Sequence, residues 1–134
     1  MKLNKDCVRD VLMYLETADF YQESDGEIDQ TPIFMDQICE NLLQWSKLDI
    51  FYSLKHMEEA GLIDATMAPG ECEFAVSDIS FYGHEFLESI KDTTQWKKVN
   101  KVLDSVKNYS LEAIKAVASG VTEAAITSCI VHTP

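Results

Sequence analysis

The sequence predicts a mainly helical α+β fold, with a winged helix-turn-helix-like core and a C-terminal helical extension. Apolar residues recur three and four positions apart in several segments that follow a helix-capping residue. Pro69 and Gly70 form a turn signal between two short strand-like segments, which predicts a β-hairpin. The order helix, helix, helix, hairpin, helix is typical of a winged helix. We expect one domain, with the core in residues 1–90 and the extension in residues 91–134.

The first predicted helix covers about residues 4–18, because Asn4 is a good N-cap and an acid at Asp6 favours the first turn. Its apolar residues have the spacing of one buried helix face. They are Val8, Val11, Leu12 and Leu15. The polar, acidic residues 19–31 that follow predict a loop or a short edge strand.

The second predicted helix starts at Thr31, an N-cap, places Pro32 in its first position and runs to about Leu43. Its expected buried residues are Met35, Ile38, Cys39 and Leu42. Ser46 and Asp49 have the spacing of a capping box and predict a third helix, which ends at Gly61. The core side of this third helix is expected to consist of Ile50, Phe51, Leu54 and Met57.

The hairpin is expected to pair residues 62–68 with residues 73–77, and three further helices are expected after it. Ser80 is the predicted cap of the fourth helix, Thr93 or Thr94 of the fifth, and Ser110 of the sixth. The apolar positions of the fourth and fifth helices are Phe81, Phe86, Leu87, Ile90, Trp96, Val99, Val102, Leu103 and Val106. We expect one core that contains Ile50, Leu54, Met57, Ile63, Phe86, Leu87, Val8, Val11 and Leu15.

The sixth helix has an apolar stripe with coiled-coil spacing. The stripe consists of Leu111, Ile114, Ala118, Val121 and Ala125. Two interpretations remain open: a homodimer through residues 111–130, or a helix that folds back on the first helix of its own chain.

Composition narrows the class of protein. The 134 residues are 46% hydrophobic and 25% charged, as in ordinary globular proteins. A net charge of -12 argues against binding to nucleic acid or to anionic membranes. We find no signal peptide and no stretch that approaches the length of a membrane span, and we expect a cytoplasmic protein.

The cysteines lack paired ligand spacing, which predicts reduced thiols and no zinc site; they are Cys7, Cys39, Cys72 and Cys129.

Three stretches together resemble a family of small bacterial and phage proteins called domain of unknown function 2513. The first contains Met1, Lys2, Leu3, Asn4, Asp6, Cys7, Arg9, Asp10 and Glu16. The second contains Ile50, Phe51, Tyr52, Ser53, Leu54, Lys55, Glu59, Ala60, Gly61, Leu62 and Ile63. The third contains Asp78, Ile79, Ser80, Phe81, Gly83, His84, Glu85, Phe86, Leu87, Ile90, Lys91, Asp92, Trp96, Lys97 and Lys98. The resemblance implies a winged-helix-like fold and frequent residence in prophages or mobile elements, and it implies no catalytic residue or cofactor.

The third helix is the element that would enter the DNA major groove in this topology. Its expected solvent face consists of Asp49, Tyr52, Ser53, His56 and Glu59. That face contains two acids and no Lys or Arg, whereas groove readers gain affinity from basic contacts to phosphate. A solvated helix or a protein-contact face is the alternative interpretation.

Other candidate sites have plain structural explanations. A basic cluster is typical of the solvent-exposed face of an amphipathic helix, although it could also bind phosphate; its members are Lys91, Lys97, Lys98, Lys101 and Lys107. His84 beside Glu85 has no nucleophile partner in the sequence, and Gly83 is expected to permit close packing. Residues 25–36 resemble a calcium loop only weakly, because the sixth-position glycine and the twelfth-position Glu are absent. We expect no metal and no cofactor.

The strongest charge asymmetry is the span between Arg9 and Lys47, which holds nine acids and no Lys or Arg. The candidate partner-binding residues within it are Glu23, Asp25, Glu27, Asp29, Asp36 and Glu40. Either the span only adds solubility, or it docks a basic protein partner. We expect a non-enzymatic binding module that contacts another protein through this acidic surface, with a DNA-binding transcriptional regulator as the alternative.

Overall fold

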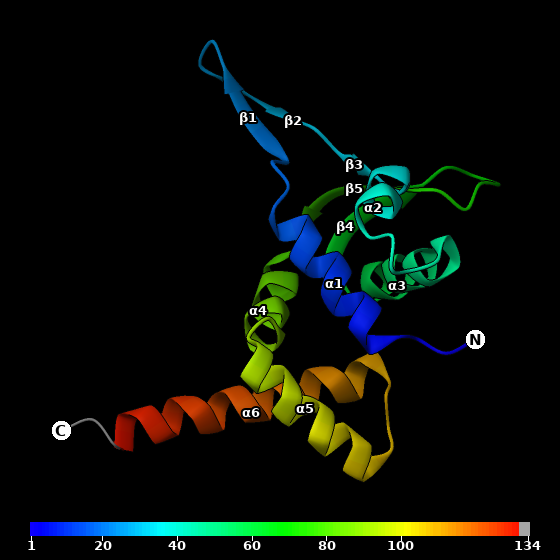
Figure 1. Ribbon diagram of the computed structural model, residues 1–134. Helices are drawn as coiled ribbons and strands as arrows, with labels where there is room; N and C mark the ends of the chain where they lie inside the picture. The colour runs from blue at the N-terminus through cyan, green and yellow to red at the C-terminus, as the bar shows by residue number, and fades with distance from the viewer. Residues whose placement is uncertain (132–134) are drawn as a thin grey trace.

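The computed structural model describes residues 1–131 and is α+β and mainly helical, as the sequence predicts (Figure 1). The helices of this part of the chain are α1 (Lys5–Glu16), α2 (Met35–Asn41), α3 (Lys47–Glu59), α4 (Phe81–Ile90), α5 (Thr93–Val106) and α6 (Leu111–Val131). The strands are β1 (Tyr21–Ser24), β2 (Glu27–Gln30), β3 (Ile33–Phe34), β4 (Ile63–Met67) and β5 (Phe74–Ile79).

A β-hairpin stands where the sequence predicted a loop or a short edge strand. Strands β1 and β2 pair antiparallel, with Tyr21 opposite Gln30 and Glu23 opposite Ile28. The turn between them has positive φ at Asp25 (51°) and at Gly26 (79°). Two successive positive φ angles suit the twist of a two-residue hairpin, and Asp-Gly is a favoured sequence for this turn. The calcium-like segment, residues 25–36, therefore begins with a hairpin turn and continues through β2 and β3 into α2.

The second helix begins later than predicted, and the start at Thr31 and Pro32 is wrong. The amide of Thr31 donates to the carbonyl of Phe20 at 2.8 Å, which continues the hairpin ladder. Ile33 and Phe34 then form β3, which pairs with β5. The residue before a proline favours extended backbone, which suits Thr31, and the pairing with β5 keeps the chain extended to Phe34. Helix α2 buries Met35 and Ile38, while Cys39 and Leu42 are only partly buried.

The second sheet contains the predicted hairpin and has the strand order β3-β5-β4. The turn at Pro69 and Gly70 is present, and Gly70 has a φ of 78°. Helix α3 has its predicted limits, since the hydroxyl of Ser46 accepts from the amide of Asp49 at 3.1 Å and Gly61 follows the helix with a φ of 73°.

The predicted core is confirmed. Its nine predicted members from α1, α3, β4 and α4 are all buried in one cluster. The cluster continues into the C-terminal helices, where Trp96, Val99, Leu103, Ile114 and Ala118 are buried. The C-terminal helices therefore share the core with the N-terminal part of the chain.

Three polar residues of α1 attach this helix to other elements. The carboxylate of Asp6 accepts from Nε1 of Trp96 at 3.0 Å, and that of Asp10 accepts from Nε1 of Trp45 at 2.8 Å. The guanidinium of Arg9 donates to the carbonyls of Ile90 (2.8 Å) and Lys91 (2.7 Å) at the end of α4. Asp6, Arg9 and Asp10 therefore have structural roles, and all three belong to the first of the stretches that resemble the family.

Helices α4 and α5 differ from the prediction in their details. Asp92 caps α5 by accepting from the amide of Gln95 at 2.9 Å, so the predicted caps Thr93 and Thr94 are wrong and lie inside the helix. Asp is as good an N-cap as Ser and better than Thr, which explains the earlier start. Three predicted core positions are exposed because they lie beside the buried stripes and nothing packs over them: Phe81, Val102 and Val106.

Helix α6 starts at its predicted cap, because the hydroxyl of Ser110 accepts from the amide of Ala113 at 3.1 Å. It packs mainly on α5 and α4, so the interpretation that it folds back on α1 is wrong. Ile114 and Ala118 are buried, but Ile126 and Ile130 are 55% and 71% exposed. The later turns of α6 extend beyond the body of the molecule (Figure 1).

The same helix corrects an expectation about membrane spans. The segment Leu111–Ile130 is long and apolar enough to cross a membrane by length and composition, whereas no such stretch was expected. Small residues lower the apparent hydrophobicity of this segment, since Ala, Ser, Gly and Thr separate its Ile and Val residues.

Gly83 in α4 has almost no space for a side chain. A Cβ atom added there would lie 1.9 Å from the carbonyl oxygen of Leu62 and 2.7 Å from the side chain of Ile79. The backbone at Leu62 cannot retreat easily, since its amide donates to Met57 and its carbonyl accepts from Ser80.

We therefore predict that Gly83→Ala lowers the free energy of unfolding by about 1–3 kcal/mol or more, because it overpacks a helix–strand contact. Gly120→Ala is the matched control. No neighbouring atom lies within 4 Å of the corresponding position in α6, and the helix preference of Ala should stabilise this variant by up to about 1 kcal/mol. Urea denaturation measures both; equal effects of the two substitutions would contradict the close contact at Gly83.

Candidate functional site

The hairpin β1–β2 carries the most exposed group of predicted site residues. Every residue of both strands is exposed, including the apolar Tyr21 and Ile28, which are 52% and 74% exposed. The exposed carboxylates on it are Glu23, Asp25, Glu27 and Asp29. Figure 1 shows that the hairpin projects away from the helices.

The two faces of the hairpin both carry acids. Side chains alternate between the faces of a strand, and directly paired residues share a face. Glu23 therefore lies on the face that also carries Tyr21 and Ile28, whereas Glu27 and Asp29 lie on the opposite face. No Lys or Arg occurs anywhere in this segment, so the acids have no basic neighbour along the hairpin.

The base of the hairpin is held against the end of β5. The hydroxyl of Tyr21 hydrogen-bonds to the carboxylate of Asp78, and this bond raises the pKa of Tyr21. The side-chain amide of Gln30 donates to the carbonyl of Ser77 at 3.1 Å and to the Tyr21 hydroxyl at 3.2 Å. Phe20, just before β1, is buried. The hairpin thus has a fixed base and an uncovered outer part.

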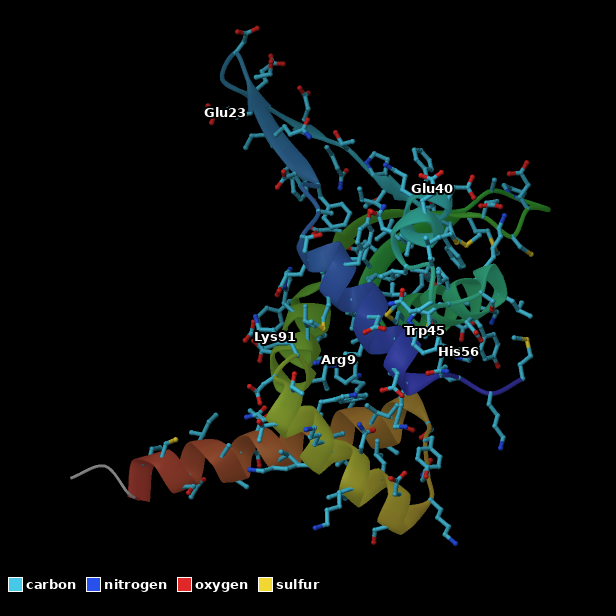
Figure 2. All side chains as sticks on the ribbon, viewed as in Figure 1. Arg9, Glu23, Glu40, Trp45, His56 and Lys91 are labelled. Carbon is cyan, nitrogen blue, oxygen red and sulfur yellow. The ribbon has the colours of Figure 1, made fainter. Side chains whose placement is uncertain are left out.

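Asp36 and Glu40 belong to a different part of the surface. Both are exposed on α2, and Figure 2 shows Glu40 there, well apart from Glu23 on the hairpin. Asp36 lines a groove of about 490 Å³ between α2 and the β4–β5 hairpin. The predicted acidic surface is therefore divided between the β1–β2 hairpin and α2.

Sequence reasoning missed four residues around Asp36. The exposed apolar side chains are Phe34 and Met67, and the acids are Glu71 and Glu73. Pairing of β3 with β5 brings these distant segments together, and no local pattern could indicate it. Lys47 also reaches this region, with its ammonium 2.7 Å from Glu73 and 3.8 Å from Asp36.

The predicted DNA-facing surface of α3 is wrong at Ser53, which is completely buried. Its hydroxyl faces the buried thiol of Cys7 on α1, because α1 packs over this side of α3. Asp49 is engaged by the hydroxyl of Ser46 at 3.0 Å. The rings of Tyr52 and His56 pack edge to face, with centroids 4.4 Å apart.

The lysines of α3 form ion pairs with acidic side chains. Lys55 forms an ion pair with Glu59, and this hydrogen bond raises the pKa of Lys55 and lowers that of Glu59. Lys47 is paired with Glu73, which raises its pKa in the same way. His56 Nδ1 lies 3.6 Å from Glu59. The α3 surface therefore offers little positive charge to a phosphate backbone.

The basic cluster does not form one patch with five equivalent members. Lys91 lies at the end of α4 and pairs with Glu88 at 2.7 Å and Glu16 at 3.6 Å. Lys97, Lys98 and Lys101 are exposed on α5, while Lys107 lies beyond the end of that helix. Within residues 1–131, no group of three or more His, Cys, Asp or Glu side chains is placed to hold a metal ion.

A family model described as "Hypothetical protein (DUF2513)" matches residues 2–110, which is most of the chain. The chain belongs to the DUF2513 family. The matched segment includes every element from α1 to α5 and stops before α6. A relative from Haemophilus influenzae, described as "Uncharacterized protein", is 27% identical over 121 residues, which cover 88% of this chain and 92% of the relative. No solved structure matches the chain.

Cys7, in the DUF2513 segment, is the most deeply buried thiol. Burial raises the pKa of Cys7 from 9.0 to about 11, although the nearby hydroxyl of Ser53 opposes part of the shift. A protonated thiol is a weak nucleophile, so this residue is suited to packing rather than to covalent chemistry.

We predict that the stability contributed by the protonated Cys7 thiol is lost as the pH rises from about 9 to 11. An unfolded thiol ionises near pH 9, whereas the folded one keeps its proton until about pH 11. The folded state therefore binds more protons in this window, and stability falls with pH. Cys7→Ala should flatten this decline in denaturant titrations, and Cys72→Ala, at an exposed position, should not. A decline unchanged in Cys7→Ala would contradict the assignment.

Proposed function

We propose that this chain is a non-enzymatic, winged-helix-like binding module of phage or mobile-element type. Its acidic β1–β2 hairpin binds a basic segment of another protein. The strand order β3-β5-β4 beside α1, α2 and α3 supports the winged-helix part of the proposal. The phage or mobile-element part rests on the family resemblance. The non-enzymatic part rests on a sequence without a P-loop, dinucleotide glycines or a nucleophile elbow.

The observation that carries the proposal is the uncovered hairpin. A two-stranded sheet is only marginally stable in water, and this one buries no strand residue against the body. It exposes Tyr21 and Ile28 together with its four acids. A basic segment with some apolar residues would cover the two apolar side chains and neutralise the carboxylates.

The outer edges of the hairpin suit an added strand. Each strand of a two-stranded sheet is paired on one side only, so β1 and β2 both present free backbone groups. An extended peptide can pair with such an edge, and its side chains then alternate between the two acidic faces. The proposed partner is therefore an extended segment in which basic and apolar residues alternate.

The alternative function, a DNA-binding transcriptional regulator, is favoured by the same strand order and helix arrangement, which many DNA-binding proteins use. The pairing of Lys47 and Lys55 with acids disfavours it. Sequence-specific affinity for duplex DNA at physiological salt distinguishes the two functions.

We also propose a cytoplasmic location. Ile114 and Ala118 fix the first turns of α6 in the core. This packing against the body of the protein supports a soluble role for α6.

We predict that a hairpin variant with Glu23→Lys, Asp25→Asn and Glu27→Lys loses affinity for a labelled peptide of alternating lysine and valine by about tenfold or more. Asn replaces Asp25 because it tolerates the positive φ of the turn. The wild-type association rate, measured by stopped flow, should fall with added salt, since exposed charges are screened within roughly 10 Å at 0.1 M salt.

The matched control carries Glu85→Lys, Glu112→Gln and Glu123→Lys, which give the same change in net charge at exposed positions away from the hairpin. Its affinity should stay within about twofold of the wild type. Equal losses in the two variants would show a general charge effect and contradict docking on the hairpin. Specific binding of the wild type to duplex DNA at physiological salt would favour the alternative function.

We propose in addition that two copies associate through the exposed turns of α6. The predicted homodimer through residues 111–130 is narrowed to the turns after Ala118, because the earlier turns pack inside the chain. Ile126 and Ile130 are the large apolar side chains that a second α6 would cover.

For this assembly we predict that Ile126→Asp with Ile130→Asp gives a monomer with unchanged secondary structure, because both side chains are exposed. Thr127→Asp, which is exposed on another side of α6, should leave the dimer intact. Ile114→Asp should unfold the protein instead, since Ile114 is buried. Light scattering measures the mass, and a monomeric wild type at high micromolar concentration would exclude the dimer.

A further inference from the structure

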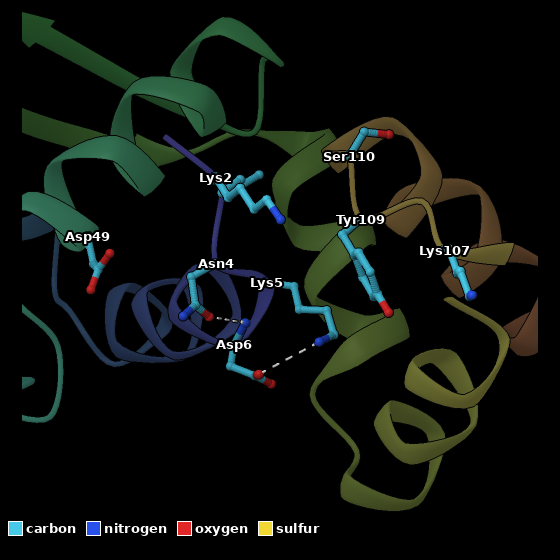
Figure 3. Close-up of a pocket in the computed structure, with 9 residues that line it drawn as sticks. Lys2, Asn4, Lys5, Asp6, Asp49, Lys107, Tyr109 and Ser110 are labelled. Atoms are coloured by element: carbon cyan, nitrogen blue, oxygen red, sulfur yellow. Dashed lines mark hydrogen bonds and ion pairs between the residues drawn. The ribbon is translucent and has the colours of Figure 1, made fainter. Parts of the chain in front are cut away.

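A groove of about 770 Å³ lies between the start of α1 and the connection from α5 to α6 (Figure 3). It is separate from the acidic hairpin and shares only Asp49, at the start of α3, with the α3 surface. Its lining brings together residues about 100 positions apart in the sequence: Lys2, Lys5 and Asp6 at the start of α1, and Lys107, Tyr109 and Ser110 before α6.

Three lysines gather in this groove, although the chain has only 11 basic residues against 23 acids. In the described part of the chain, no carboxylate lies within ion-pair distance of Lys2 or Lys107. Lys5 approaches only the neighbouring Asp6, at 3.9 Å. This separates them from Lys47, Lys55 and Lys91, which all pair with acids elsewhere.

The two acids of the groove already have other partners. Asp6 accepts from Nε1 of Trp96 at 3.0 Å, and Asp49 accepts from the hydroxyl of Ser46 at 3.0 Å. These neutral donors leave the negative charge on both carboxylates, so the three lysines exceed them by one positive charge. The groove is a local excess of positive charge on a molecule whose net charge is -12.

Tyr109 adds a half-exposed aromatic wall beside the lysines. Its hydroxyl donates to Asp104 at 2.7 Å, which fixes the ring, and the ammonium of Lys5 lies 5.2 Å from the ring centroid. In Figure 3 the ring lies between Lys5 and Lys107. Helices α1 and α6 also begin here, after Asn4 and Ser110, and the start of a helix carries partial positive charge.

We propose that this groove binds an anion with two or more phosphate groups, with Lys2, Lys5 and Lys107 contacting the phosphoryl oxygens. Lysine ammonium groups bind phosphate as point charges and need no fixed bidentate geometry. Three of them in one open groove suit a ligand with several separated charges better than a single small anion. The phosphates come from a nucleic-acid backbone or from a free polyphosphate such as a nucleotide.

The probes are inorganic pyrophosphate and an eight-nucleotide oligothymidylate, each titrated into the full chain by calorimetry. The fluorescence of Trp96 gives a second readout, because its indole bonds to Asp6 in the groove, and a Trp45→Phe background isolates its signal. We expect saturable binding of at least one probe.

The groove variant is Lys2→Gln with Lys107→Asn, since Asn accepts the positive φ of 55° at that position. It should weaken binding about tenfold or more. The matched control, Lys97→Gln with Lys98→Asn, removes the same charge from the exposed side of α5, and its affinity should stay within about twofold of the wild type. Thermal melting checks that both variants fold.

Competition identifies the source of the phosphates. If the oligonucleotide binds and displaces pyrophosphate, the ligand is a nucleic-acid backbone; if pyrophosphate alone binds, the ligand is a free polyphosphate. Either result, with loss in the groove variant only, supports the site. No saturable binding of either probe, or equal losses in the groove and control variants, would overturn it.

Discussion

The guanidinium of Arg9 is the contact on which the arrangement of the C-terminal helices depends. A helix leaves its last carbonyls without partners inside the helix, and Arg9 takes up two of them at the end of α4. It also lies over the ring of Trp96, 5.6 Å from its centroid. The carboxylate of Asp6 accepts a hydrogen bond from the N–H of that indole. Together these contacts fix the chain between α4 and α5, and the positions of α6 and of the lysine groove follow from it.

Local sequence signals predicted the fold where they agreed with long-range packing. Ser46 and Gly61 delimit α3, and the nine predicted core residues are buried together. The prediction failed at Thr31 and Pro32, where a helix-start signal competes with strand pairing. Strand pairing prevails because β3 pairs with the otherwise free side of β5, and because the Thr31 amide already donates a hydrogen bond to Phe20 in the hairpin. Such a competition depends on distant residues, which a local pattern does not contain.

The candidate site was predicted as a run of acids, but a run along the chain is not a surface. Asp10 and Glu16 lie in the same run and serve other contacts, with Trp45 and Lys91. The hairpin acids remain exposed, while those on α2 join Glu71 and Glu73 from a distant turn. Helical periodicity placed Ser53 in solvent, because it cannot tell which neighbouring helix will cover an intermediate position. Lys2 and Lys107 meet only through tertiary structure, which explains why sequence reasoning did not connect them.

The attachment of the β1–β2 hairpin to the end of β5 has a mechanical consequence. Tyr21 hydrogen-bonds to Asp78 and Gln30 to Ser77, so the hairpin is fixed at its base and free at its tip. A force on the turn at its tip acts on these few hydrogen bonds over the whole length of the hairpin. The force then passes to β5, the central strand of the three-stranded sheet, which is paired on both sides. Pulling on the hairpin is therefore resisted by the whole sheet and not by the hairpin alone.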